Sequence, residues 1–173
     1  ATVYATALIK PDAKCVFISS DSDRYSAIFK TITPGLVSTN ETEETSLKYD
    51  IVFITDDKLN VLKGANKVAK GGILANVFDA SKFNAGEFKN FLESFPGDDV
   101  RLWMFSKTEW MLARRLDGSK VKMANMLDLL SRDEVISLEA ERAGCGSIQD
   151  ILASYVGKRE EIIPVFSGAN LKT

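Results

Sequence analysis

The chain alternates short, almost entirely apolar runs with longer segments in which apolar residues recur at helical spacing. The apolar runs are rich in Val, Ile and Phe, which favour β-strands. They cover residues 15–18, 36–38, 50–55 and 73–78. A strand that is apolar at every position is typical of a parallel sheet buried on both faces. The pattern therefore predicts an α/β protein in which helices connect parallel strands through right-handed crossovers.

Helices are predicted where apolar residues repeat every three or four positions. These segments are residues 2–10, 24–30, 58–70 and 84–95. Gly71-Gly72 follows the third of them directly and is predicted to form its C-cap, ahead of the next strand. Pro96-Gly97 closes the fourth helix with a turn.

The pattern changes in the last third of the chain. Residues 100–105 and 109–114 are two aromatic and aliphatic runs joined by a short polar connection, which predicts an antiparallel β-hairpin. Residues 121–163 are predicted to be helical, with a break at 144–146 and a new helix capped by Ser147. We expect an α/β domain over residues 1–118 and a helical C-terminal extension, packed on it, over residues 119–173.

Composition excludes several classes of function. The 173 residues carry 22 Lys and Arg against 24 Asp and Glu, so no basic surface favours nucleic-acid binding. The chain has no His, which removes Ser-His-Asp and Cys-His catalysis, and its two Cys cannot form a four-thiolate metal site. No apolar run approaches membrane-spanning length, so no direct membrane insertion of this chain is expected. No metal site is predicted.

Several segments carry a resemblance to a known family. Residues 91–96, 100–103 and 108–113 resemble the end of the spermidine synthase-like (aminopropyltransferase) domain. Residues 133–135 and 144–156 resemble the helical extension that follows this domain in membrane-fused bacterial members. The resemblance implies a Rossmann-like, class I methyltransferase-type fold, with a mostly parallel sheet and a terminal antiparallel hairpin. It implies S-adenosylmethionine, its decarboxylated form or methylthioadenosine as possible ligands.

One departure from the family concerns the Gly-rich loop after the first strand, where backbone N–H groups approach the ligand. This sequence has no such loop, and residues 2–10 align with the helix that should follow it. The first strand and its loop are therefore lost, or they lie upstream of residue 1. Loss of this central strand would expose the side of Cys15–Ile18 that faces residues 50–55, unless something covers it.

Acidic residues that follow three of the predicted strands are the candidate ligand contacts. Asp21 and Asp23 follow the first apolar run, where the family holds ribose hydroxyls with an acid; helix capping is the simpler interpretation. Glu41 follows the run at 36–38, where the family reads the adenine amine; a solvated acidic loop is the simpler interpretation there.

Asp56 and Asp57 are the candidate catalytic residues. They follow the strand at 50–55, where a family Asp accepts a proton from the amine nucleophile or orients it. The alternative is that both residues begin the next helix, because carboxylates stabilise helix N-termini.

Three functions remain open at this point. The first is a spermidine synthase-like domain without full catalytic competence. The second is an active aminopropyl- or methyltransferase whose Gly-rich loop lies upstream of residue 1. A nucleoside or an amine is the small-molecule ligand expected in either case. The third is a non-enzymatic interaction module of a larger membrane-associated protein, which self-associates through a sheet edge as a homo-oligomer. The expected location is the cytoplasm or the cytoplasmic face of a membrane protein.

Overall fold

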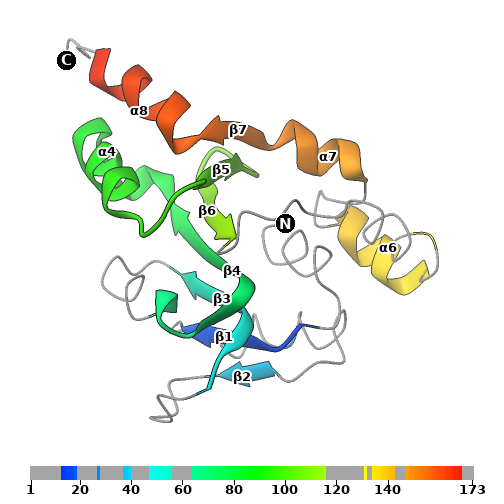
Figure 1. Cartoon of the computed structure of the whole chain (residues 1–173). Helices are drawn as coiled ribbons and strands as arrows, with labels where there is room; N and C mark the ends of the chain where they lie inside the picture. The colour runs from blue at the N-terminus through cyan, green and yellow to red at the C-terminus, as the bar shows by residue number, and fades with distance from the viewer. Residues whose placement is uncertain are drawn as a thin grey trace.

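The computed structural model describes residues 13–18, 27, 37–39, 47–55, 64–115, 131, 134–142 and 147–168. Its strands are β1 (Cys15–Ile18), β2 (Val37–Thr39), β3 (Tyr49–Thr55), β4 (Val68–Asp79), β5 (Arg101–Met104), β6 (Glu109–Arg115) and β7 (Tyr155–Lys158). Its helices are η1 (Ala80–Lys82), α4 (Ala85–Ser94), α6 (Glu134–Arg142), α7 (Ile148–Ala153) and α8 (Arg159–Gly168). The strands form one sheet in the order β2-β1-β3-β4-β6-β5-β7 (Figure 1).

The first four strands of this sheet are parallel, and the rest of it is antiparallel. β5 and β6 pair antiparallel and form the hairpin predicted from the sequence. β6 also pairs antiparallel with β4, which joins the hairpin to the parallel strands. The protein therefore has the Rossmann-like, class I methyltransferase-type α/β fold that its sequence led us to expect. The strand predictions at residues 15–18, 36–38 and 50–55 are confirmed to within one or two residues.

β1 pairs directly with β3 in the middle of the parallel half. The two strands are in register over four positions, from Cys15 opposite Ile51 to Ile18 opposite Ile54. The Lys14 carbonyl accepts hydrogen bonds from the N–H groups of Asp50 and Ile51, at 2.9 and 3.1 Å. Thus β3 itself covers the side of β1 that the sequence left in question.

The helix predicted at 58–70 is wrong at its C-terminal end, and so is the C-cap predicted at Gly71-Gly72. Gly64 and Ala65 are helical, residues 66–67 form a turn, and β4 begins at Val68. Gly71-Gly72 lies inside β4, where the register with β3 shifts: Tyr49 pairs with Val68, but Ile51 pairs with Ile73. The intervening β4 residues form a bulge, and Gly71 adopts a φ of 75° there.

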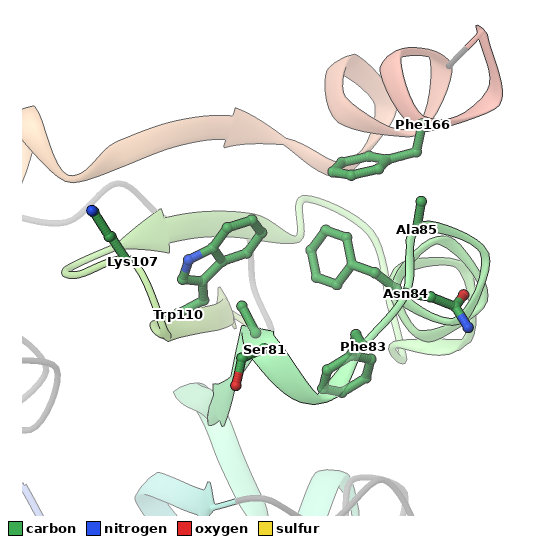
Figure 2. Close-up of a pocket in the computed structure, with 9 residues that line it drawn as sticks. Ser81, Phe83, Asn84, Ala85, Lys107, Trp110 and Phe166 are labelled. Atoms are coloured by element: carbon green, nitrogen blue, oxygen red, sulfur yellow. The ribbon is translucent and has the colours of Figure 1, made fainter. Parts of the chain in front are cut away.

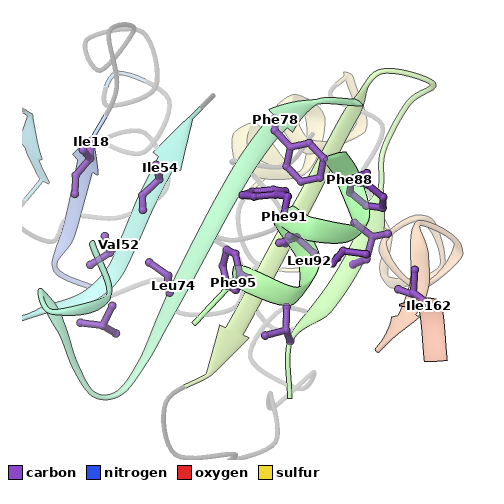
Figure 3. Packing of buried hydrophobic residues seen from close by; sticks show 14 of the residues in the cluster. Ile18, Val52, Ile54, Leu74, Phe78, Phe88, Phe91, Leu92, Phe95 and Ile162 are labelled. Carbon is purple, nitrogen blue, oxygen red and sulfur yellow. The ribbon is translucent and has the colours of Figure 1, made fainter. Parts of the chain in front are cut away.

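The hydrophobic core lies between the sheet and α4, with α8 packed beside it (Figure 3). α4 begins at a capping box, in which Asn84 accepts from the N–H of Glu87 and the Glu87 carboxylate accepts from the N–H of Asn84. Its apolar face buries Phe88, Phe91 and Leu92 against the strands, each at most 5% exposed. Burial of three large side chains on one helical stripe explains why this helix was predictable from periodicity alone.

The opposite face of the parallel strands is buried as well, as their unbroken apolar sequence predicts. Cys15, Phe17, Ile51 and Phe53 are inaccessible to solvent, and the rings of Phe17 and Phe53 lie 5.4 Å apart across β1 and β3. The buried thiol of Cys15 donates to the carbonyl of Ala13.

The C-terminal segment contributes a strand to the sheet. Ser147 caps α7 through a reciprocal box with Asp150, as predicted. The expected helix is nevertheless wrong at residues 155–158, because β7 pairs antiparallel with β5 there. Trp103 of β5 contacts Tyr155 of β7, with ring centroids 5.5 Å apart. The Arg159 guanidinium then donates to the carbonyls of Phe95 and Gly97, which ties the start of α8 to the turn after α4.

Asp99 neutralises two cations that face each other across β5 and β7. Arg101 and Lys158 are register partners, and like charges in that position repel each other. The Asp99 carboxylate accepts two hydrogen bonds from Arg101, at 3.0 and 3.3 Å, and lies 3.6 Å from the Lys158 ammonium group. The hydrogen bond from Arg101 is the main reason why the pKa of Asp99 falls below its usual value.

We expect Asp99→Asn to lower the free energy of unfolding by about 0.5 kcal/mol at neutral pH, the size typical of an exposed ion pair. Asn tolerates the φ of 50° found at this position, so the substitution tests charge rather than backbone strain. Because folding lowers the pKa of Asp99, its contribution is present above the ordinary Asp pKa of 3.8 and disappears as pH falls through the lower native pKa. Urea unfolding across this range should show the two proteins converging in acid. A constant difference at all pH values would contradict the assignment.

Candidate ligand sites at the carboxyl end of the sheet

The four parallel strands end at the same edge of the sheet. Ile18 of β1 lies beside Ile54 of β3, and Thr55 lies beside Val77 of β4. In open α/β sheets, ligands bind outside the carboxyl ends of the strands. This edge is therefore where a ligand site is expected, and the chain segments that follow β1 and β3 both leave the sheet from it.

The five acidic residues singled out from the sequence follow these strand ends, but they lie outside the described residues. They are Asp21, Asp23, Glu41, Asp56 and Asp57. Asp56 follows Thr55 directly, and residue 19 follows Ile18 directly. Their assignment to ribose, adenine or amine binding therefore stays a prediction.

Asp79 is the described acidic residue at the end of β4, and it stabilises the turn that follows. Its carboxylate accepts from the backbone N–H of Ser81 at 2.9 Å and from the Ser81 hydroxyl at 2.6 Å. The Ser81 hydroxyl is the first cause of a pKa for Asp79 below its usual value. The carboxylate thus caps η1, and its charge is held locally by hydrogen bonds.

Asn76 is a polar residue inside the apolar core. It is 1% exposed, and neither atom of its side-chain amide has a hydrogen-bond partner. It lies on β4 between Leu74 and Phe78, opposite Ile54 on one side and Leu112 on the other. An unpartnered buried amide costs free energy, so packing leaves this side chain unsatisfied. Among the described residues, Trp110 Nε1 and Arg114 Nε are also buried without a hydrogen-bond partner.

A cavity of about 240 Å³ opens beside the end of β4 (Figure 2). It lies where four segments converge: η1, the start of α4, the β5–β6 hairpin and α8. The lining residues are Ala80, Ser81, Phe83, Asn84, Ala85, Phe88, Lys107, Trp110 and Phe166. Four of them are aromatic, one is a cation, and none is acidic.

Both Trp residues of the hairpin make ring contacts with other elements. Trp103 contacts Tyr155, and Trp110 contacts Phe88 edge to face at 5.2 Å. The sequence did not indicate that Trp110, Lys107 and Phe166 share a cavity. The buried polar side chain of Asn76 could have been predicted, because Asn76 is the only polar residue in the strand predicted at 73–78.

Within the described ranges, no group of three or more His, Cys, Asp or Glu residues is placed to bind a metal ion. Among the same residues, no helix has the length and apolar character needed to cross a membrane.

Comparison with known proteins returned no matching family model and no matching curated protein. Solved structures gave looser matches, of which three are described. A precorrin-6y methyltransferase from Geobacter metallireducens is 10% identical, with 68% of this chain and 86% of that chain covered and a TM-score of 0.46. A tRNA methyltransferase from B. subtilis is 14% identical, with 82% and 79% covered and a TM-score of 0.43. Spermidine synthase from Thermotoga maritima is 9% identical, with 82% and 72% covered and a TM-score of 0.43. At these identities and TM-scores, the matches carry no statement about the activity of this chain.

Proposed function

We propose that this chain is a spermidine synthase-like domain of the S-adenosylmethionine-binding fold that lacks full catalytic competence. The observation that supports the proposal is the direct pairing of β1 with β3. In the family that the sequence resembles, the strand before the Gly-rich loop is central in the sheet. This sequence has no Gly-rich loop, and its sheet is closed where that strand would lie.

Insertion of another strand between β1 and β3 would require breaking a continuous set of contacts. It would separate four register pairs and the two hydrogen bonds to the Lys14 carbonyl. It would also move Phe17 away from Phe53, whose rings are now 5.4 Å apart. Neighbouring strands are about 4.8 Å apart, so an inserted strand would roughly double the separation of β1 and β3. The closed arrangement favours a fold without the loop that would hold the nucleoside.

Ligand binding remains part of the proposal, because the five acidic residues follow β1, β2 and β3 in the sequence, and these parallel strands end at the carboxyl edge of the sheet. Asp21, Asp23 and Glu41 would accept hydrogen bonds from a nucleoside, and Asp56 and Asp57 would bind the amine. Without backbone donors from a Gly-rich loop, we expect these side chains to bind such ligands only weakly.

The direct test is calorimetric titration of the chain with S-adenosylmethionine, its decarboxylated form and methylthioadenosine, combined with an assay for transfer to a diamine. The expected result is weak binding and no transfer. Micromolar binding together with transfer would overturn the proposal. In that case Asp56→Asn and Asp57→Asn test the catalytic roles, since transfer unchanged in both variants would exclude them.

The strand pairing can be tested by a disulfide between Cys15 and a second Cys, in a Cys145→Ser background. Ile51→Cys places a thiol on the register partner of Cys15, within the range that a disulfide spans. Ile73→Cys is the matched control: it lies on the same row one strand further away, at about 10 Å, which is too far. Oxidation should cross-link only the first variant, as measured by mass and thiol titration. Failure of that cross-link in a folded protein would indicate that β1 and β3 are not neighbours.

A further inference from the structure

We propose that the cavity beside the end of β4 binds a small aromatic carboxylic acid of one or two rings. None of the acidic residues singled out from the sequence is among the lining residues, and the proposal does not depend on the activity of the fold. It is carried by the size of the cavity, by the aromatic side chains that line it and by the sign of its charge.

The volume sets the size of the ligand. At about 240 Å³, the cavity is larger than the roughly 150 Å³ cavity that holds a single benzene ring in another protein. It is smaller than the pockets of about 300–1,000 Å³ that hold drug-sized molecules. One or two fused or linked rings with a short polar substituent match this range.

The lining favours a planar aromatic group. Phe88 is the centre of the wall: its ring contacts Trp110 at 5.2 Å, Phe166 at 5.1 Å and Phe83 at 6.2 Å, with interplanar angles of 83°, 71° and 82°. All four of these aromatic side chains line the cavity, and they come from separate parts of the fold. A further ring placed among them makes the same kind of contact, which adds to the free energy of burial.

The charge of the residues that line the cavity favours an anionic ligand over a cationic one. Lys107 is the only charged side chain among the lining residues, and it forms no hydrogen bond or ion pair with any described residue. The nearby carboxylates of Asp79 and Glu87 accept hydrogen bonds from Ser81 and Asn84, and neither of them lines the cavity.

The other end of the cavity also attracts negative charge. Figure 2 shows Asn84 and Ala85 on the side of the aromatic wall away from Lys107. These residues begin α4, and the N–H groups of Ala85 and Gly86 have no partner in the described part of the chain. Free N–H groups at a helix N-terminus carry partial positive charge. An amine would therefore find unfavourable charge at both ends, whereas a carboxylate finds favourable charge.

The binding test uses three ligands of nearly equal shape: 3-phenylpropionate, 3-phenylpropanamide and 3-phenylpropylamine. Trp103→Phe leaves Trp110 as the only Trp, so its fluorescence reports on the cavity, and calorimetry gives the affinity. We expect the acid to bind with a dissociation constant of about 1 mM or lower, the amide about fivefold more weakly, and the amine not measurably. Equal affinity for all three, or no binding of the acid to the folded protein, would overturn the proposal.

Lys107→Gln tests the source of the preference for an acid. This substitution should lower the affinity for the acid about fivefold, to that of the amide, and leave the affinity for the amide unchanged. Lys82→Gln is the matched control, because it removes the same charge from a residue of η1 that does not line the cavity. An equal effect of both substitutions would mean that net charge, rather than this site, selects the acid, and would contradict the assignment.

Discussion

Gly72→Ala is expected to lower the free energy of unfolding by about 3 kcal/mol. A Cβ atom at this position would lie 2.8 Å from the carbonyl oxygen of Asp50, 2.9 Å from that of Ala69 and 2.8 Å from a methyl group of Val68. Two of the three obstacles are backbone atoms held in the β3–β4 bulge, so they cannot move aside without disturbing the sheet. Forcing extra atoms into a packed site costs about 1–3 kcal/mol, and fixed backbone neighbours place this site at the upper end. Urea unfolding followed by circular dichroism measures the loss.

Gly86→Ala is the matched control for this substitution. Gly86 lies in α4, and a Cβ atom there would approach only the Asn84 side-chain oxygen, at an ordinary 3.5 Å. Because Ala is the better helix former, this variant should be more stable than the original by about 0.5–1 kcal/mol. Equal behaviour of the two variants would show that the bulge is not as tight as described.

Phe78→Ala is expected to cost about 3–5 kcal/mol, the range typical of removing a buried aromatic side chain. Phe78 is 3% exposed and lies at the centre of an aromatic cluster. Its ring contacts those of Phe83, Phe88, Phe91 and Trp110, with centroids between 5.2 and 6.4 Å apart. The substitution therefore removes apolar burial, ring contacts from three elements and the packing that holds one side of the cavity. Thermal and urea unfolding both measure the effect.

Two companion variants separate the causes of this loss. Phe78→Leu keeps most of the buried volume and should cost less than about 1.5 kcal/mol, since such swaps are tolerated best. Val165→Ala removes an apolar side chain that is 67% exposed on α8, and should have an effect within about 0.5 kcal/mol. A loss at Val165 as large as that at Phe78 would contradict the placement of the core.

The sequence predicted most of the sheet because its strands are buried on both faces. The runs at 15–18 and 50–55 contain almost no polar residue, and a segment of that length and composition favours a central parallel strand. α4 was predicted to within a residue or two for a related reason: its stripe of Phe88, Phe91 and Leu92 and its Asn84 cap are both local signals. Where the residues that indicate burial or capping lie within ten positions of each other in the sequence, the predicted strand or helix is confirmed.

The features that the sequence did not predict depend on distant partners. β7 has four residues, and its pairing with β5 joins segments more than fifty residues apart, so no local pattern distinguishes it from an extension of α7. Gly71-Gly72 is consistent with a helix end as well as with a bulge, and only the register with β3 decides between them. The cavity beside the end of β4 was not predicted for the same reason, because its walls come from three separate parts of the chain.

The position of β7 has a consequence for the synthesis of the protein. Until residue 158 has left the ribosome, β5 has no outer neighbour, and its backbone N–H and C=O groups remain available to other nascent chains. The parallel half of the sheet can form earlier in translation, whereas its antiparallel border is completed only after residue 158 has been made. Premature termination before β7 should therefore yield polypeptides that associate through this unfinished border and require chaperones.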